Sequence, residues 1–241
     1  MKRIASKDKL IVALDVASKK EAQSLLSELT PEVKIFKIGP YLYSRYGPDI
    51  VKLVHKYRAK VFLDLKLHDI PATVANTMKQ LVGLRVFMLT LHAQGGLDMM
   101  QAARQQADKS AGELKTKAPH ILAVTVLSSF NKSDLRQIGV DKNINEQVYK
   151  LTRLAKQAKL SGVVLSAKEL RRAGKLLGDD FIAVCPGIRP KAASKDDQKR
   201  TATPKEAIDN GASFIVVVRP VIKAKNPQKA ALGIIKDIRG E

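Results

Sequence analysis

Two aspartates and a lysine, Asp64, Lys66 and Asp69, stand close together within residues 64–69. Asp64 and Lys66 are two residues apart in a run that is predicted to be a strand, so both side chains leave on the same face and can enter one pocket. Lys37, from the preceding predicted strand, can join them. Two carboxylates then alternate with two ammonium groups, and each charge favours the ionised form of its neighbours. This charged array predicts a protonated lysine that acts as a proton donor.

The charged array also has structural interpretations. Asp69 comes two residues before Pro71, which suits the first turn of a helix, so Asp69 could be a helix cap. The array as a whole could be a buried network of ion pairs. Burying such charges is costly, however, and this favours a functional reason for placing them at the end of a strand.

Two arginines, Arg189 and Arg219, follow the last two predicted strands. Barrel proteins often hold a phosphate group at this place. Gly187 lets backbone N–H groups approach an anion, and arginine offers forked donors that match phosphate oxygens. The pattern therefore favours a phosphate site over two incidental surface arginines. The long basic loop 186–203 is predicted to be a functional lid, in which Gln198 could fold back over the bound group.

Eight short β-branched runs alternate with longer amphipathic segments and predict one (β/α)8 TIM barrel over residues 1–241. The length fits the roughly 200 to 250 residues of such a domain. An open doubly wound sheet is disfavoured, because it usually has fewer strands and a glycine-rich first turn. The predicted strands are 10–15, 33–38, 60–66, 85–91, 120–127, 162–166, 181–185 and 213–218. Helices are predicted to begin near Ser18, Tyr41, Ala72, Leu97, Asn145, Ala167, Pro204 and Pro227, with a capping box formed by Ser18 and Glu21.

Polar residues end nearly every predicted strand, where a barrel builds its active site. They are Asp15, Lys37, Asp64 with Lys66, His92, Ser128, Ser166, Arg189 and Arg219. We interpret His92 and the nearby His68 as packing residues, because no carboxylate–histidine set at metal spacing accompanies them. No metal site is expected.

The chain carries 43 Lys and Arg against 23 Asp and Glu, a net charge of +20 that favours anionic partners. Much of the charge falls on predicted outer helices and is interpreted as a solvated basic face. Aromatic residues make up only 5% and Trp is absent, so a nucleic-acid partner is not expected. A single cysteine, Cys185, and the lack of a long apolar run predict a soluble cytoplasmic protein with no membrane partner.

The segment Asp64–Pro71, DLKLHDIP, resembles the signature of the orotidine 5'-monophosphate decarboxylases. Other segments are similar to the family's motifs in order and spacing, over about residues 10 to 225. They are ALD at 13–15, FKIG at 36–39, LHAQGG at 91–96, VTVLS at 124–128, PGIRP at 186–190, DDQ at 196–198 and RP at 219–220. A DxKxxD element alone is shared with metal-dependent sugar-phosphate decarboxylases, but the combined motifs are specific.

The resemblance implies an enzyme that converts orotidine 5'-monophosphate to UMP and CO2 without a cofactor. Lys66 would donate the proton to C6 of the pyrimidine, and Asp64, Lys37 and Asp69 would complete the charged array. In the family the second aspartate comes from the partner subunit. Asp69 would therefore act across a homodimer interface, with Ile70 and Thr73 near the neighbour's substrate.

The resemblance also implies the remaining binding roles: Asp15 and Lys37 at the ribose, Ser128 at the pyrimidine, Gln198 between base and phosphate, and Arg189 and Arg219 at the phosphate. Val218 departs from the pattern, because the family usually has Gly before the phosphate arginine, and weaker phosphate binding is expected. Ser128 replaces a common Thr and keeps the hydroxyl.

Two alternatives stay open. One is a metal-dependent decarboxylase or aldolase acting on keto-sugar phosphates, which would hold Mg2+ on the DxKxxD carboxylates. The other is a nucleic-acid-binding module that uses the positive charge, which predicts a steep salt dependence of binding and no need for Lys66.

Overall fold

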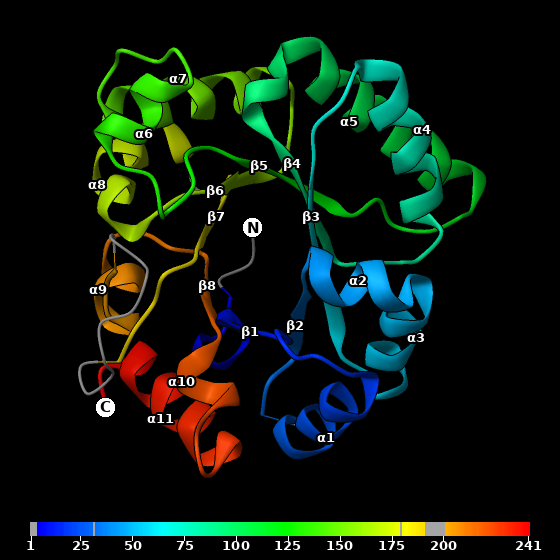
Figure 1. Ribbon diagram of the computed structural model, residues 1–241, viewed down its shortest axis with the longest axis vertical. Helices are drawn as coiled ribbons and strands as arrows, with labels where there is room; N and C mark the ends of the chain where they lie inside the picture. Colours follow the sequence, from blue (N-terminus) through cyan, green and yellow to red (C-terminus); the bar gives the residue numbers. More distant parts are fainter. Residues whose placement is uncertain (1–3, 31, 179, 191–200) are drawn as a thin grey trace.

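The structure is a computed structural model that describes residues 4–30, 32–178, 180–190 and 201–241. Its eight strands form a closed parallel barrel in sequence order, and the helices surround it (Figure 1). β1 closes the barrel, because Ile11 pairs with Ile35 on one side and with Val216 on the other. The predicted (β/α)8 barrel is thus confirmed.

All eight predicted strands are present. They are β1 Leu10–Ala13, β2 Ile35–Ile38, β3 Lys60–Leu67, β4 Met88–His92, β5 His120–Val124, β6 Gly162–Val164, β7 Ile182–Cys185 and β8 Phe214–Val217. Most predicted strands were too long at their ends. The apolar run of β5, for example, continues to Leu127, but its pairing with β6 ends at Val124 and the chain then turns away to line the mouth of the barrel.

The predicted helix starts agree with the structure to within one residue. The helices are α1 Lys19–Leu29, α2 Pro40–Tyr46, α3 Pro48–Lys56, α4 Pro71–Val82, α5 Gly96–Glu113, α6 Lys132–Gln137, α7 Ile144–Gln157, α8 Ala167–Leu177, α9 Pro204–Asp209, α10 Arg219–Ile222 and α11 Pro227–Arg239, with 3-10 turns η1 Ser6–Lys9 and η2 Ala93–Gly95. Sequence reasoning missed α3, α6 and α10. Gly47, at a φ of 52°, separates α2 from α3, a backbone turn that glycine permits.

The predicted capping box at α1 is only half correct. The Ser18 hydroxyl accepts the Glu21 N–H at 3.2 Å, as expected. The Glu21 carboxylate, however, accepts from the N–H of Ala17 at 3.0 Å instead of from Ser18. The carboxylate therefore accepts from the residue before the cap, whereas a capping box uses the N–H of the cap residue itself.

The alternation of side chains along each strand explains why charge reaches the mouth of the barrel. Ile35 and Phe62 belong to the apolar cluster inside the barrel. Lys37 and Asp64 follow them by two residues and so face the same interior. The apolar residues fill the lower barrel, and the charged ones emerge at the carboxyl ends of the strands. Among the described residues, no helix is long and apolar enough to span a bilayer.

Candidate active site

A cavity opens at the carboxyl ends of the strands. It is lined by Lys37, Phe62, Asp64, Lys66, Val124, Val126, Leu127, Ser128, Val164, Leu165, Ser166, Pro186, Gly187, Arg189, Val216 and Val218. Three of these residues are cationic and one is a carboxylate, so the cavity favours an anionic ligand. Phe62 and the valines form an apolar wall in the same cavity. Such a site can hold a flat ring against the wall and present its polar edge to the lysines.

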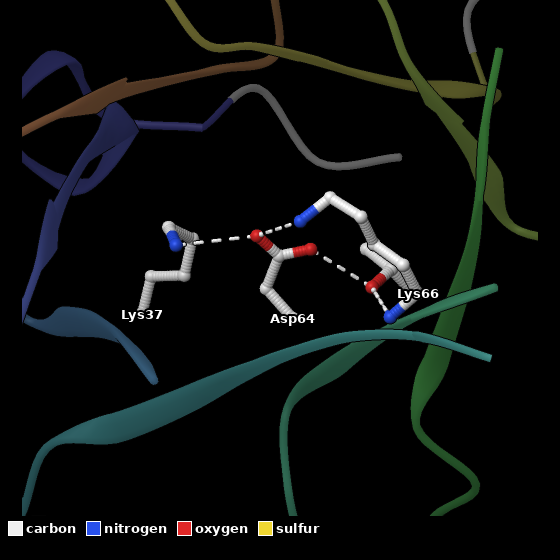
Figure 2. A network of polar contacts seen from close by, with 4 residues as sticks. Lys37, Asp64 and Lys66 are labelled. Carbon is white, nitrogen blue, oxygen red and sulfur yellow. Dashed lines mark hydrogen bonds and ion pairs between the residues drawn. The ribbon is translucent and has the colours of Figure 1, made fainter. Parts of the chain in front are cut away.

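Lys37, Asp64 and Lys66 form one connected unit, called here the Lys–Asp–Lys cluster. The two lysines reach the same oxygen of Asp64 from different sides (Figure 2). The Asp64 Oδ2 atom lies 2.9 Å from Lys66 Nζ and 3.2 Å from Lys37 Nζ. In the described part of the chain, no other carboxylate makes an ion pair with either lysine.

Asp64 is ionised in this cluster. Burial alone would raise the pKa of the carboxyl, but the charges of Lys37 and Lys66, together with hydrogen bonds from Lys66 and Thr90, outweigh it and lower the pKa. The resulting carboxylate is the counter-ion of both neighbouring lysine side chains. It holds the end of the Lys66 side chain beside the cavity.

β3 does not alternate regularly through this segment, in contrast to the simple strand that the sequence predicted. Its pairing with β4 moves from Leu63 opposite Leu89 to Leu67 opposite Leu91, which makes a bulge. Lys66 lies in the bulge at a φ of 52°, a conformation that residues with side chains rarely adopt. Both charged side chains still reach one cavity, as expected.

Thr90 is the site residue that sequence reasoning missed. It lies on β4 and its hydroxyl donates to Asp64 Oδ1 at 2.9 Å and accepts the Lys66 N–H at 2.9 Å. The available signal was a polar residue inside the apolar run of β4. A lone threonine in a strand is common, however, so no sequence pattern selected Thr90.

The cavity also contains three residues expected near the base and phosphate: Ser128, Arg189 and Val218. Arg189 is only 9% exposed, and its backbone N–H donates to the Ala202 carbonyl oxygen at 2.9 Å. Gly187 has a φ of 78°, which a side chain would disfavour. The φ of Val218 is −124°, so the backbone at this position does not require glycine.

Two other expected binding residues do not line this cavity. Arg219 begins α10 and is partly buried. Asp15 is exposed beyond β1, where it lines a separate shallow hollow with residues of α1 and α10. Gln198 lies outside the described residues.

Asp69, Ile70 and Thr73 form an exposed strip, in which Asp69 and Ile70 join β3 to α4 and Thr73 lies in the first turn of α4. Asp69 accepts the N–H of Ile70 at 2.7 Å, but the cap position of α4 is Ile70, so Asp69 is not the helix cap that the sequence allowed. Ile70 is 66% exposed, more than any other large hydrophobic side chain in the described part of the chain. Within one chain these three residues do not line the cavity.

His68 and His92 lie beside one another, with ring centroids 5.6 Å apart. Burial, assisted by His68 and Lys66, lowers the pKa of His92. The described residues contain no group of three or more His, Cys, Asp or Glu that could hold a metal ion. A packing role for the two histidines stays a prediction.

A closed barrel whose mouth carries a Lys–Asp–Lys cluster, an apolar wall and a buried arginine defines a class of (β/α)8 proteins suited to anionic ligands. Residues 8–234 match the orotidine 5'-phosphate decarboxylase / HUMPS family, and the chain belongs to that family.

Several relatives in this family are similar over nearly the whole chain. An orotidine 5'-phosphate decarboxylase from Moorella thermoacetica is 42% identical over 239 residues, which are 99% of this chain and 95% of that protein. One from Carboxydothermus hydrogenoformans is 43% identical over 233 residues, 97% of each chain. The crystal structure of orotidine 5'-phosphate decarboxylase from Lactobacillus acidophilus superposes with a TM-score of 0.84 at 36% identity, covering 96% of this chain and 99% of that one. These findings confirm the resemblance that the motifs indicated.

Proposed function

We propose that this chain is an orotidine 5'-monophosphate decarboxylase, which makes UMP and CO2 in the last step of pyrimidine biosynthesis. Residues 1–241 would act as one catalytic domain in the cytoplasm. The observation that carries the proposal is the Lys–Asp–Lys cluster at the barrel mouth, in a chain whose relatives of about 40% identity bear this name.

The chemical difficulty of this reaction is the electron pair left on C6 of the pyrimidine when the bond to the carboxylate breaks. No cofactor delocalises it, so fixed charges must stabilise it. The Lys66 ammonium group would lie close to C6 and favour the developing anion. Its proton then goes to C6, and the bond to CO2 is replaced by a C–H bond. Lys66 would be left neutral and regain a proton from solvent.

Asp64 has two effects in this proposal. It is the counter-ion of Lys66 and aligns its side chain through the contact at 2.9 Å. It would also lie beside the substrate carboxylate and disfavour the bound ground state by like-charge repulsion, an effect that departure of CO2 relieves.

The rest of the substrate would be held as the family resemblance implies. Arg189 and Arg219 would bind the phosphate, with Gln198 joining phosphate and base. Ser128 would bind the pyrimidine, while Asp15 and Lys37 would bind the ribose. Phosphate binding far from C6 can supply free energy for closing the site against water. The side chain of Val218 would weaken phosphate binding by crowding the phosphate, since the backbone conformation there does not require glycine.

The occupied oxygens of Asp64 argue against the metal-dependent alternative. One oxygen accepts from both lysines, and the other accepts from Thr90. A metal ion at Asp64 would have to displace ammonium groups that already neutralise the carboxylate. The cluster also argues against a nucleic-acid-binding module. Such a module would bind through surface charge and would not need Lys37, Asp64 and Lys66 inside a cavity.

The proposed function is tested by adding purified protein to orotidine 5'-monophosphate and following the loss of its absorbance. Turnover is expected, and EDTA should leave the rate unchanged because lysines occupy the carboxylate of Asp64. A rate that falls with EDTA and returns with Mg2+ would contradict the lysine mechanism. If the nucleotide is untouched while keto-sugar phosphates react in the presence of Mg2+, the metal-dependent alternative is correct.

We further propose that the active form is a homodimer in which Asp69 completes the neighbour's charged array. The exposed strip with Asp69, Ile70 and Thr73 supports this, because its large apolar side chain is left uncovered in one chain.

Complementation between two inactive variants tests the shared site. Asp69→Ala and Lys66→Ala should each be nearly inactive alone. When the two are co-expressed in equal amounts, about half the dimers are mixed, and each mixed dimer has one complete site. About a quarter of wild-type activity should return. Full activity of Asp69→Ala alone, or no recovery in dimers shown to be mixed by native mass spectrometry, would contradict the shared site.

A further inference from the structure

Thr90 makes two hydrogen bonds whose directions are fixed by chemistry. Its side chain is fully buried. An ionised carboxylate can only accept, so the hydroxyl proton must point to Asp64 Oδ1, 2.9 Å away. A backbone N–H can only donate, so Lys66 N must use a lone pair of the same oxygen, also at 2.9 Å. One hydroxyl thus joins the two charged residues of β3 that line the cavity, Asp64 and Lys66.

The backbone of Lys66 depends on this contact. The bulge in β3 interrupts the strand ladder between Leu63 and Leu67, and Thr90 lies opposite the gap on β4. The Lys66 N–H therefore bonds to the Thr90 side chain instead of to a backbone carbonyl. The positive φ of Lys66 is rarely adopted by residues other than glycine, and it needs surroundings that hold it in place.

Thr90 also gives the two oxygens of the Asp64 carboxylate different partners. Because Oδ1 is bonded to Thr90, the carboxylate cannot rotate freely, and Oδ2 stays directed at Lys37 and Lys66. The hydroxyl contributes to the lowered pKa of Asp64 as well. A small shift of either partner would move the Lys66 ammonium group relative to the bound ring, and such shifts are costly for catalysis.

We infer that Thr90 is a positioning residue that sets the direction of the Lys66 ammonium group by fixing the Lys66 backbone and the Asp64 carboxylate with a single hydroxyl. The inference rests on the proposed decarboxylation. Thr90 does not line the cavity, so it acts through these two residues and not by touching substrate.

The test compares Thr90→Val, which keeps the shape but removes the hydroxyl, with Thr90→Ser, which keeps the hydroxyl. Thr90→Val should lower kcat by roughly 10- to 100-fold, the range expected for losing a hydrogen bond to a charged group, with KM nearly unchanged. Thr90→Ser should stay within about threefold of wild type. The acid limb of the kcat profile should move to higher pH in Thr90→Val only, because the pKa of Asp64 rises when the hydrogen bond is lost.

Thr152→Val is the matched control. Thr152 is equally buried, but its hydroxyl bonds only to the Val148 carbonyl at 2.8 Å on outer helix α7, so kcat and its pH profile should not change. Wild-type kcat and pH profile in Thr90→Val, or equal losses in the valine and serine variants, would overturn the inference. If Thr90→Val does not fold, Thr90→Ala is compared with Thr90→Ser instead, and the same differences in kcat and in its pH profile decide the inference. An inactive wild-type protein would instead refute the proposed function.

Discussion

Replacing Lys66 with alanine should lower kcat for orotidine 5'-monophosphate by about 10,000-fold or more, because the variant loses both the proton donor and the charge that stabilises the anion at C6. Binding of UMP should weaken far less, since the phosphate and ribose contacts remain. Steady-state absorbance assays and UMP titrations by calorimetry measure the two quantities separately.

The control for this prediction is Lys150→Ala, which removes an exposed lysine from outer helix α7 and should leave kcat unchanged. The pair also separates the proposed enzyme from the nucleic-acid-binding alternative, which needs surface lysines and not Lys66. A Lys66→Ala protein that keeps a tenth of the wild-type rate would show that another group donates the proton.

Asp64→Asn should reduce kcat by about 1,000-fold, because the amide keeps the shape of the side chain but removes the anion that pairs with Lys66 and aligns it. The variant leaves Lys37 and Lys66 as two close cations without a counter-ion. We therefore also expect a loss of about 1–3 kcal/mol in the free energy of unfolding at neutral pH. Kinetic assays and urea denaturation measure the two effects.

The pH dependence of that stability difference has a definite sign. The pKa of Asp64 is lowered in the folded protein, so its contribution is fully present above the unfolded value of roughly 4 and is lost as the pH falls through the folded pKa. The difference between wild type and Asp64→Asn should stay constant from about pH 6 to 8 and shrink only in acid. A difference that fades at neutral pH would mean that Asp64 is not held as a carboxylate.

The alternation of short β-branched runs with longer amphipathic segments by itself determined the barrel. The eight strands could be found because each is a short run with its own hydrophobic pattern, and the helix starts because prolines and capping residues act locally. The spacing of Asp64 and Lys66 likewise predicted a shared pocket, although the bulge in β3 means that regular alternation does not bring Lys66 there. These features depend on neighbours in the chain, which is why they are visible in the sequence.

Only the tertiary structure decided the features that depend on contacts between distant residues. The bulge at Lys66 arises from the register of β3 against β4, and Thr90 belongs to the site because that register sets it opposite the gap. The apolar part of the cavity lining comes from β3, β5, β6 and β8, which are far apart in the chain. Asp15 and Arg219 follow the ends of β1 and β8 and fall outside the cavity, whereas Lys37, within β2, lines it. The exposure of Asp69 likewise follows from how the chain leaves the barrel. Strand register and side-chain direction are set by packing across the whole barrel, and a local sequence pattern does not contain that information.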